Sequence, residues 1–225
     1  MDRIIPKNTV LVLSGVACVG KTTAAYGLIK KCSDFRRVNE LDIIRTIVRA
    51  TLTDTYQNNY LTKDFIMEHY SSLFKSLSVS DFETAKRQSQ ALIPYVKEII
   101  LRQQQRNIST VLEGAGIIPS TYFPKNKPLY WLNNTVIFIN LNLSDEIDHI
   151  NRRQARCDER EYSDSYNDTK RKIQEIRNYN TLLHEETLAL SKRFKNVFSM
   201  DVSGKSSDGV VDTILDKVKK YFSDL

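Results

Sequence analysis

The sequence contains few of the residues that build disulfide frameworks, zinc sites or fibrous repeats. Its 225 residues include three cysteines, three histidines, seven glycines and five prolines. Cys18, Cys32 and Cys157 are widely spaced and form no C-x-x-C pair, which argues against a disulfide framework or a structural zinc site. So few unpaired cysteines are typical of a reducing compartment, and we expect a cytoplasmic protein.

Long hydrophobic runs are also lacking. The longest apolar stretches, such as Val10–Leu13, fall far short of the roughly 18–20 residues that span a bilayer. The N-terminus carries Asp2, Arg3 and Lys7 and has no apolar core of the kind found in signal peptides. We therefore expect no membrane partner.

The composition is that of a globular protein with a moderate excess of positive charge. Hydrophobic residues make up 41% of the chain, which is enough for a sizeable buried core. Lys and Arg number 33 against 27 Asp and Glu, a net charge of +6 that suits phosphorylated or nucleic-acid ligands. The length predicts one domain, with room for inserted helices.

Short apolar runs rich in β-branched residues alternate with segments of helical periodicity. Strands are predicted at Thr9–Ser14, Arg37–Leu41, Ser109–Leu112, Thr135–Leu141 and Val197–Val202. Helices are predicted at Lys21–Lys31, Asp42–Leu52, Phe65–Leu77, Phe82–Arg106, Ser144–Glu161, Lys170–Lys192 and Asp208–Phe222, and a loop at Gly116–Trp131. This alternation predicts an α/β fold, a three-layer sandwich whose mostly parallel sheet has helices on both faces.

One motif carries most of the functional information. The segment Gly15–Thr22 matches G-x-x-x-x-G-K-[ST] in full, and it lies between a predicted strand and a predicted helix. In such a loop backbone N–H groups bind phosphate oxygens, the lysine reaches the outer phosphates and the hydroxyl holds Mg²⁺. We assign Lys21 as a catalytic residue and Thr22 as a metal ligand. The predicted nucleotide-binding residues are Gly15, Val16, Ala17, Cys18, Val19, Gly20, Lys21, Thr22 and Thr23.

Charged residues follow the second and third predicted strands, at the edge of the sheet where ligands bind in open α/β folds. Asp42 is a candidate general base for an attacking hydroxyl, and Arg45 could hold an anionic group of the substrate. Glu113 could orient a water on Mg²⁺ or bind a substrate hydroxyl. The structural alternatives are a helix cap for Asp42 and a solvated strand end for Glu113. Arg49 is expected to be solvated.

Four arginines share one face of a predicted helix. At 3.6 residues per turn, Arg152, Arg153, Arg156 and Arg160 fall within an arc of about 100°. Unpaired guanidinium groups in such a row would repel one another, which favours a polyphosphate partner. We therefore predict that these arginines form a lid over the nucleotide, with Arg156 as a catalytic residue. The alternatives are a solvated face paired with nearby acids and a face that contacts RNA.

Four segments together resemble a known family. They are Ser14–Thr23, Leu41–Arg49, Val111–Pro119 and Arg152–Arg156. The chain resembles small P-loop kinases of the nucleoside-monophosphate-kinase type, and among them 2-phosphoglycerate kinase, zeta-toxin-like and polynucleotide-kinase-like proteins. The resemblance implies a sheet of order 2-3-1-4-5, ATP as donor and Mg²⁺ as cofactor. It also implies a single kinase domain over 1–225, a helical insertion at about 53–106 and a lid at about 152–168. Leu41 stands where such relatives have a small hydroxyl residue.

The resulting hypothesis is transfer of the γ-phosphate of ATP to a hydroxyl of a small, phosphorylated acceptor, as in 2-phosphoglycerate kinase. One alternative is a kinase of polynucleotide 5′-hydroxyl ends, with the aromatic segment Tyr122–Trp131 stacking on bases. Another is a nucleoside or nucleotide kinase. The third is a nucleotide-binding regulatory protein without acceptor phosphorylation. Against it, Asn140 and Asn142 end the fourth strand, where motor ATPases carry an acidic residue.

Overall fold

A five-stranded parallel sheet forms the centre of the protein in the computed structural model, which describes residues 5–57, 70–73, 82–159 and 166–225. The strands are β1 (Val10–Ser14), β2 (Phe35–Glu40), β3 (Ser109–Glu113), β4 (Val136–Asn142) and β5 (Val197–Asp201). Their order in the sheet is β2-β3-β1-β4-β5, and each neighbouring pair is parallel. The predicted fold class and strand order are therefore confirmed.

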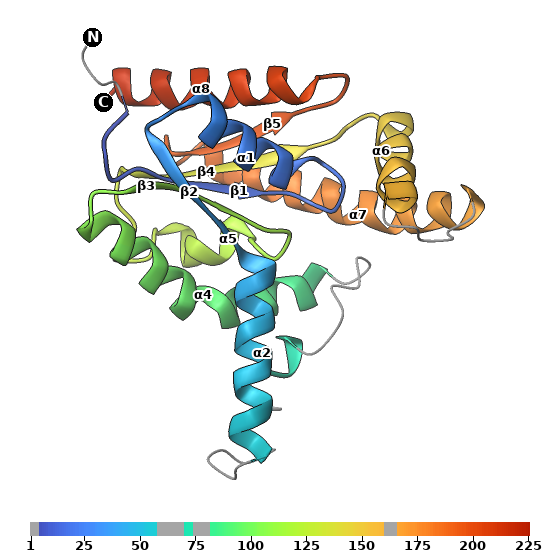
Figure 1. Ribbon diagram of the computed structural model, residues 1–225, viewed down its shortest axis with the longest axis horizontal. Coiled ribbons are helices and arrows are strands. Elements are labelled where there is room, and N and C mark those ends of the chain that lie inside the picture. Colours follow the sequence, from blue (N-terminus) through green and yellow to red (C-terminus); the bar gives the residue numbers. More distant parts are fainter. Residues whose placement is uncertain (1–4, 58–69, 74–81, 160–165) are drawn as a thin grey trace.

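Helices cover both faces of the sheet (Figure 1). Helices α1 (Lys21–Lys31) and α8 (Ser207–Ser223) lie on one face, and α4 (Phe82–Gln105), α5 (Pro119–Tyr122) and α7 (Tyr166–Ser191) on the other. Helix α6 (Glu146–Glu159) stands at the end of the sheet where β1 and β4 finish, and α2 (Leu41–Gln57) projects away from it. A 3₁₀ turn, η1, spans Pro124–Asn126.

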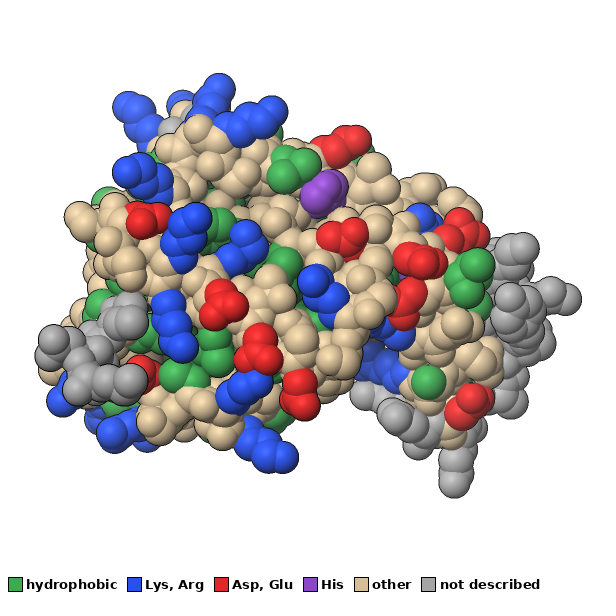
Figure 2. Space-filling model, turned by 90° about the horizontal axis from the view of Figure 1, so that it is seen from above, with side chains coloured by type: hydrophobic (Ala, Val, Ile, Leu, Met, Phe, Trp, Pro, Cys, Tyr) green, Lys and Arg blue, Asp and Glu red, His purple; other side chains and the backbone are tan. Residues whose placement is uncertain are grey.

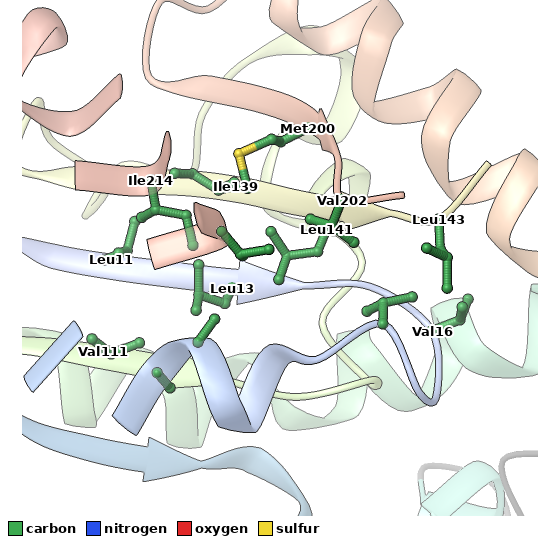
Figure 3. Close-up of a cluster of buried hydrophobic side chains, with 14 of the residues drawn as sticks. Leu11, Leu13, Val16, Val111, Ile139, Leu141, Leu143, Met200, Val202 and Ile214 are labelled. Carbon is green, nitrogen blue, oxygen red and sulfur yellow. The ribbon is translucent and has the colours of Figure 1, made fainter. Parts of the chain in front are cut away.

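Successive side chains of β1 point to opposite faces of the sheet and enter two separate cores. Leu11 and Leu13 pack in the cluster that includes Ile214 of α8 (Figure 3). Val10 and Val12 pack in the other cluster, with buried leucine, valine and isoleucine side chains of α4. Because both faces are covered, β1 is apolar throughout except at Ser14, and this explains why its sequence shows no alternation of polar and apolar residues.

Several predicted boundaries were wrong by a few residues. Leu41 begins α2 instead of ending β2, and α2 continues to Gln57, beyond the predicted end at Leu52. Ser144, the predicted first residue of its helix, bonds to Asp201 instead, and Asp145 caps α6 by accepting a hydrogen bond from the backbone N–H of Asp148 at 3.0 Å. Helix α7 includes Tyr166, four residues before the predicted start at Lys170. The helix predicted at 65–77 lies largely outside the described residues.

The segment from Gly116 to Trp131 is not the open loop predicted from its prolines. It contains α5 and η1, and its aromatic residues pack against β4. Tyr122 is fully buried, and Trp131 is only 7% exposed and contacts Tyr122 edge to face. Of the two tyrosines and one tryptophan in the proposed stacking segment, only Tyr130 is exposed, at 86%. Buried rings cannot stack on bases, so this part of the polynucleotide hypothesis loses its support.

Among the described residues, none of the helices is both long enough and apolar enough to cross a lipid bilayer.

The start of α2 is set by a tight contact with β3. Leu41 is 1% exposed and lies against Gly114, the residue that follows β3. A Cβ atom placed on Gly114 would stand 2.6 Å from the Cβ of Leu41, too close for any side chain without movement of the backbone. This packing explains why a buried leucine precedes Asp42, and it fixes the position from which α2 departs.

We predict that Gly114→Ala lowers the free energy of unfolding by about 1–3 kcal/mol, because the added methyl group overpacks this contact. Urea unfolding would measure this change in the free energy of unfolding. Gly116→Ala is the matched control, since its Cβ would meet Leu41 at an ordinary 3.6 Å, and we expect a change within about 0.5 kcal/mol. Equal stability of the two variants would contradict this account.

Candidate active site

The phosphate-binding loop, Gly15–Thr22, leaves β1 at a point where only glycine fits. Gly15 has φ of 141°, and a Cβ atom there would stand 2.6 Å from the carbonyl oxygen of Leu141 and 2.9 Å from Cγ2 of Val19. The backbone of the loop therefore lies directly against the end of β4. Gly20, with φ of 91°, is the residue before α1, so the loop also enters that helix through a residue with positive φ. This geometry places backbone N–H groups at a helix N-terminus, where anions bind.

Lys21 is folded back over the loop. Its side chain is largely buried, and Nζ donates a hydrogen bond to the carbonyl oxygen of Val16 at 2.8 Å. Burial lowers the pKa of Lys21, while the carboxylates of Glu113 and Asp42 act to raise it and the charge of Arg156 acts to lower it. The structure thus brings four of the predicted site residues, from four different elements, within electrostatic range of one another.

Glu113 and Thr22 form a direct contact. Glu113 ends β3, and its Oε1 accepts a hydrogen bond of 2.9 Å from the hydroxyl of Thr22. Burial raises the pKa of Glu113, while the ammonium of Lys21 and the bond from Thr22 act to lower it. Asp42 and Glu40 also act to raise it. The structural alternative of a solvated strand end is wrong, because Glu113 is only 5% exposed.

The pair of oxygen donors fits a magnesium ion. Mg²⁺ prefers hard oxygen ligands and commonly takes one or two from the protein, the rest coming from water and phosphate. Among the residues that the structure describes, no group of three or more His, Cys, Asp or Glu side chains could hold a metal by itself. A magnesium ion here would therefore rest on Thr22, Glu113 and the phosphates of a nucleotide.

A cleft of about 610 Å³ opens beside the loop. Figure 2 shows a hollow on the α1 and α8 face, beside the part of the molecule formed by α6, with Lys or Arg side chains in it. The cleft is lined by Cys18, Val19, Gly20, Lys21, Thr22, Thr23, Ala24, Asp148, Arg152, Ala155, Arg156, Lys205, Ser206, Ser207 and Val210. The loop between β5 and α8 was missed by our sequence analysis. The rule that ligands bind beyond the carboxyl ends of parallel strands, applied to β5, would have found it.

The arginine stripe is not the unpaired row that its spacing suggested. Arg152 donates to both carboxylate oxygens of Asp148, at 2.8 and 3.0 Å, and to the carbonyl oxygen of Val202 at 3.1 Å. The backbone N–H of Gly204 also donates to Asp148, which ties α6 to the loop after β5. Asp148, one turn earlier on α6, neutralises the charge of Arg152. The premise that the arginines of this face are unpaired and repel one another was therefore wrong.

The other three arginines occupy different environments. Arg156 is exposed and lines the cleft, whereas Arg153 is half-buried and is not among the lining residues. Arg160 lies outside the described residues. Of these four arginines, Arg152 and Arg156 therefore lie in the cleft beside the phosphate-binding loop.

Helix α2 brings a further carboxylate, that of Asp42, within electrostatic range of Lys21. Asp42 lies in its first turn, and Arg45 donates from Nη2 to the carbonyl oxygen of Leu73 at 3.2 Å. Burial lowers the pKa of Arg45, the neighbouring charge of Arg49 lowers it further, and Asp42 opposes both. Arg49 was expected to be solvated, but it is half-buried and close enough to Arg45 to repel it. Its position four residues after Arg45, about one helical turn on, could have indicated this.

We predict that Lys21→Met weakens ATP·Mg²⁺ binding by about 10- to 100-fold, the range for losing a charge-assisted hydrogen bond. The same change should also lower the stability of the ligand-free protein, because it removes the hydrogen bond to Val16 and leaves the buried Glu113 without its opposing charge. Calorimetric titration and thermal unfolding of the same sample separate the two effects. A folded variant that loses stability but binds ATP·Mg²⁺ like wild type would show that Lys21 is only structural.

No protein-family model and no curated protein sequence matches the chain. Similar solved structures do exist. The thymidylate kinase of Candida albicans is 17% identical, with a TM-score of 0.52, and the match covers 95% of this chain and 93% of that one. A gluconokinase from Sinorhizobium meliloti 1021 is 14% identical, with a TM-score of 0.51, and the match covers 97% and 96%. At these identities the likeness concerns the fold, and it shows that the chain has the fold of P-loop kinases.

Proposed function

We propose that the protein is a phosphotransferase that moves the γ-phosphate of ATP to a hydroxyl group of a small anionic acceptor. The observation that carries the proposal is the arrangement around Lys21. Lys21 lines the cleft beside the phosphate-binding loop and also interacts electrostatically with Asp42, an exposed carboxylate that is not among the lining residues. Two arginines, Arg45 and Arg49, follow Asp42 on α2. A phosphoryl group held by Lys21 would lie between a donor site and an acceptor site.

On the donor side, the loop N–H groups and Lys21 would bind the β- and γ-phosphates, and Arg152 and Arg156 would line the same cleft. Thr22 and Glu113 would hold Mg²⁺, which neutralises charge on the transferring phosphate. Asp148 fixes the guanidinium of Arg152 by two hydrogen bonds, so that residue is suited to a fixed wall of the site. Arg156, exposed and beside Lys21, is the better candidate for a mobile lid group that reaches the transferred phosphate.

On the acceptor side, Asp42 would accept the proton of the attacking hydroxyl. Arg45 and Arg49 are half-buried and repel one another, so an anionic group of the acceptor would stabilise the pair. Phosphate and carboxylate both match guanidinium geometry, and the resemblance to 2-phosphoglycerate kinases makes 2-phosphoglycerate the first compound to test.

The test is transfer of labelled γ-phosphate from ATP·Mg²⁺ to a panel of acceptors. The panel would hold 2-phosphoglycerate, nucleosides and their monophosphates, sugars, sugar acids and a 5′-hydroxyl oligonucleotide. We expect a labelled small anionic product, and we expect Asp42→Asn to lower kcat by about 10²- to 10⁴-fold with ATP affinity kept within about twofold.

Asp216→Asn, on the exposed face of α8, is the matched control for removal of a surface carboxylate and should react like wild type. Wild-type turnover in Asp42→Asn would exclude the proposed base. Tight ATP binding without any labelled product from the panel would instead favour a nucleotide-binding regulatory protein.

A second prediction concerns the acceptor. We expect Arg45→Met and Arg49→Met each to raise KM for the anionic acceptor by about tenfold or more, since each removes one guanidinium from the pair. KM for ATP should stay within about twofold. Arg49→Lys keeps the charge and should lie between wild type and Arg49→Met. If Arg49→Met changes KM for ATP and for the acceptor equally, the assignment of α2 to the acceptor side is wrong.

A further inference from the structure

A histidine on α6 reaches the phosphate-binding loop. His149 is fully buried, and its Nε2 lies 3.0 Å from the carbonyl oxygen of Ala17. A carbonyl oxygen can only accept, so Nε2 carries the proton and Nδ1 is the bare nitrogen of a neutral ring. Nδ1 is buried, and among the described residues it has no hydrogen-bond partner. Burial lowers the pKa of His149, Arg177 and Arg152 lower it further, and the bond to Ala17 and the carboxylate of Asp148 oppose them. A proton on Nδ1 would be buried without an acceptor among the described residues, which favours the neutral ring.

The bond from His149 sets the orientation of one peptide unit. In a trans peptide the C=O of one residue and the N–H of the next point in opposite directions. Since the carbonyl oxygen of Ala17 is directed to His149, the N–H of Cys18 is directed away from it. Cys18 lines the cleft and Ala17 does not, which fits an N–H directed to the side where phosphates would bind.

The same peptide precedes a strained residue. Cys18 has φ of 66°, in the left-handed region that a side chain disfavours. Such a conformation persists only where surrounding contacts hold it. The preceding carbonyl, that of Val16, is held by Lys21, and the carbonyl of Ala17 is held by His149. A nucleotide that draws Lys21 toward its phosphates would remove the first contact and leave the second.

We propose that His149 is a positioning residue for the donor phosphates, holding the Ala17–Cys18 peptide with its N–H toward the cleft. The proposal rests on the proposed function only in placing a nucleotide in this cleft. It also gives α6 a second task, because the helix that presents Arg152 and Arg156 to the cleft then shapes the phosphate-binding loop as well.

Three substitutions of His149 distinguish the role of its hydrogen-bond donor from the role of its side-chain volume. A glutamine amide can place an N–H close to the position of Nε2, an asparagine is too short to do so, and a leucine fills the space without a donor. We expect His149→Leu and His149→Asn to weaken ATP·Mg²⁺ binding by about three- to tenfold, the range for one net hydrogen bond, and His149→Gln to stay within about twofold of wild type. Magnesium tripolyphosphate, which carries no base or sugar, should show the same order.

A double-mutant cycle tests the link to Cys18. Glycine adopts the left-handed conformation without strain, so in a Cys18→Gly background the loop should depend less on His149. We expect the factor by which His149→Leu weakens tripolyphosphate binding to shrink by at least half in that background. An unchanged factor would overturn the role assigned to the strained residue.

Tyr221→Phe is the matched control, because it also removes a hydrogen bond from a buried side chain to a backbone carbonyl, that of Asn134, and Tyr221 is not among the residues that line the cleft. It should alter stability but not affinity.

Folded His149→Leu and His149→Asn that bind tripolyphosphate as well as wild type would overturn the proposal while leaving the proposed function intact. Equal losses in the glutamine and leucine variants would overturn it too. A wild-type protein that transfers no phosphate but follows the expected order of affinities would support it and count only against the proposed function.

Discussion

The close approach of the phosphate-binding loop to the end of β4 is the constraint on which the rest of the site depends. Gly15 brings the backbone to within van der Waals distance of the carbonyl oxygen of Leu141, where no side chain fits. The chain must then curl, and it does so through left-handed residues at Cys18 and Gly20 before α1 begins. This path determines where Lys21 and Thr22 emerge. Thr22 then meets Glu113 because β3 is the direct neighbour of β1 in the sheet.

A second tight contact places the opposite half of the site. Gly114 lies against Leu41, so α2 starts directly beside the end of β3. Asp42 follows Leu41 and shares an electrostatic environment with Lys21 and Glu113 for that reason. The two close contacts, one on each side of Glu113, hold the donor loop and α2 in a fixed relation. Packing therefore sets where the charges of Lys21, Glu113 and Asp42 meet.

Electrostatics instead shapes the wall formed by α6. Arg152 is neutralised by Asp148 and bound to the loop after β5, so two segments that are far apart in sequence form one side of the cleft. His149 links the same helix to the phosphate-binding loop. The polar groups of this helix are thus used for placing backbone segments as much as for contact with a ligand.

The sequence by itself determined the fold class and the phosphate-binding loop, because periodicity and a glycine-containing motif are local properties of the chain. The strand order followed from the family resemblance that four of its segments carry. It also indicated Glu113 and Asp42, since parallel strands end at a common edge. Only the tertiary structure decided that Arg152 bonds to Val202, that Arg45 bonds to Leu73, that Tyr122 and Trp131 are buried, and that His149 touches Ala17. Each of these depends on a contact between segments distant in sequence, which side-chain spacing along one helix or loop does not specify.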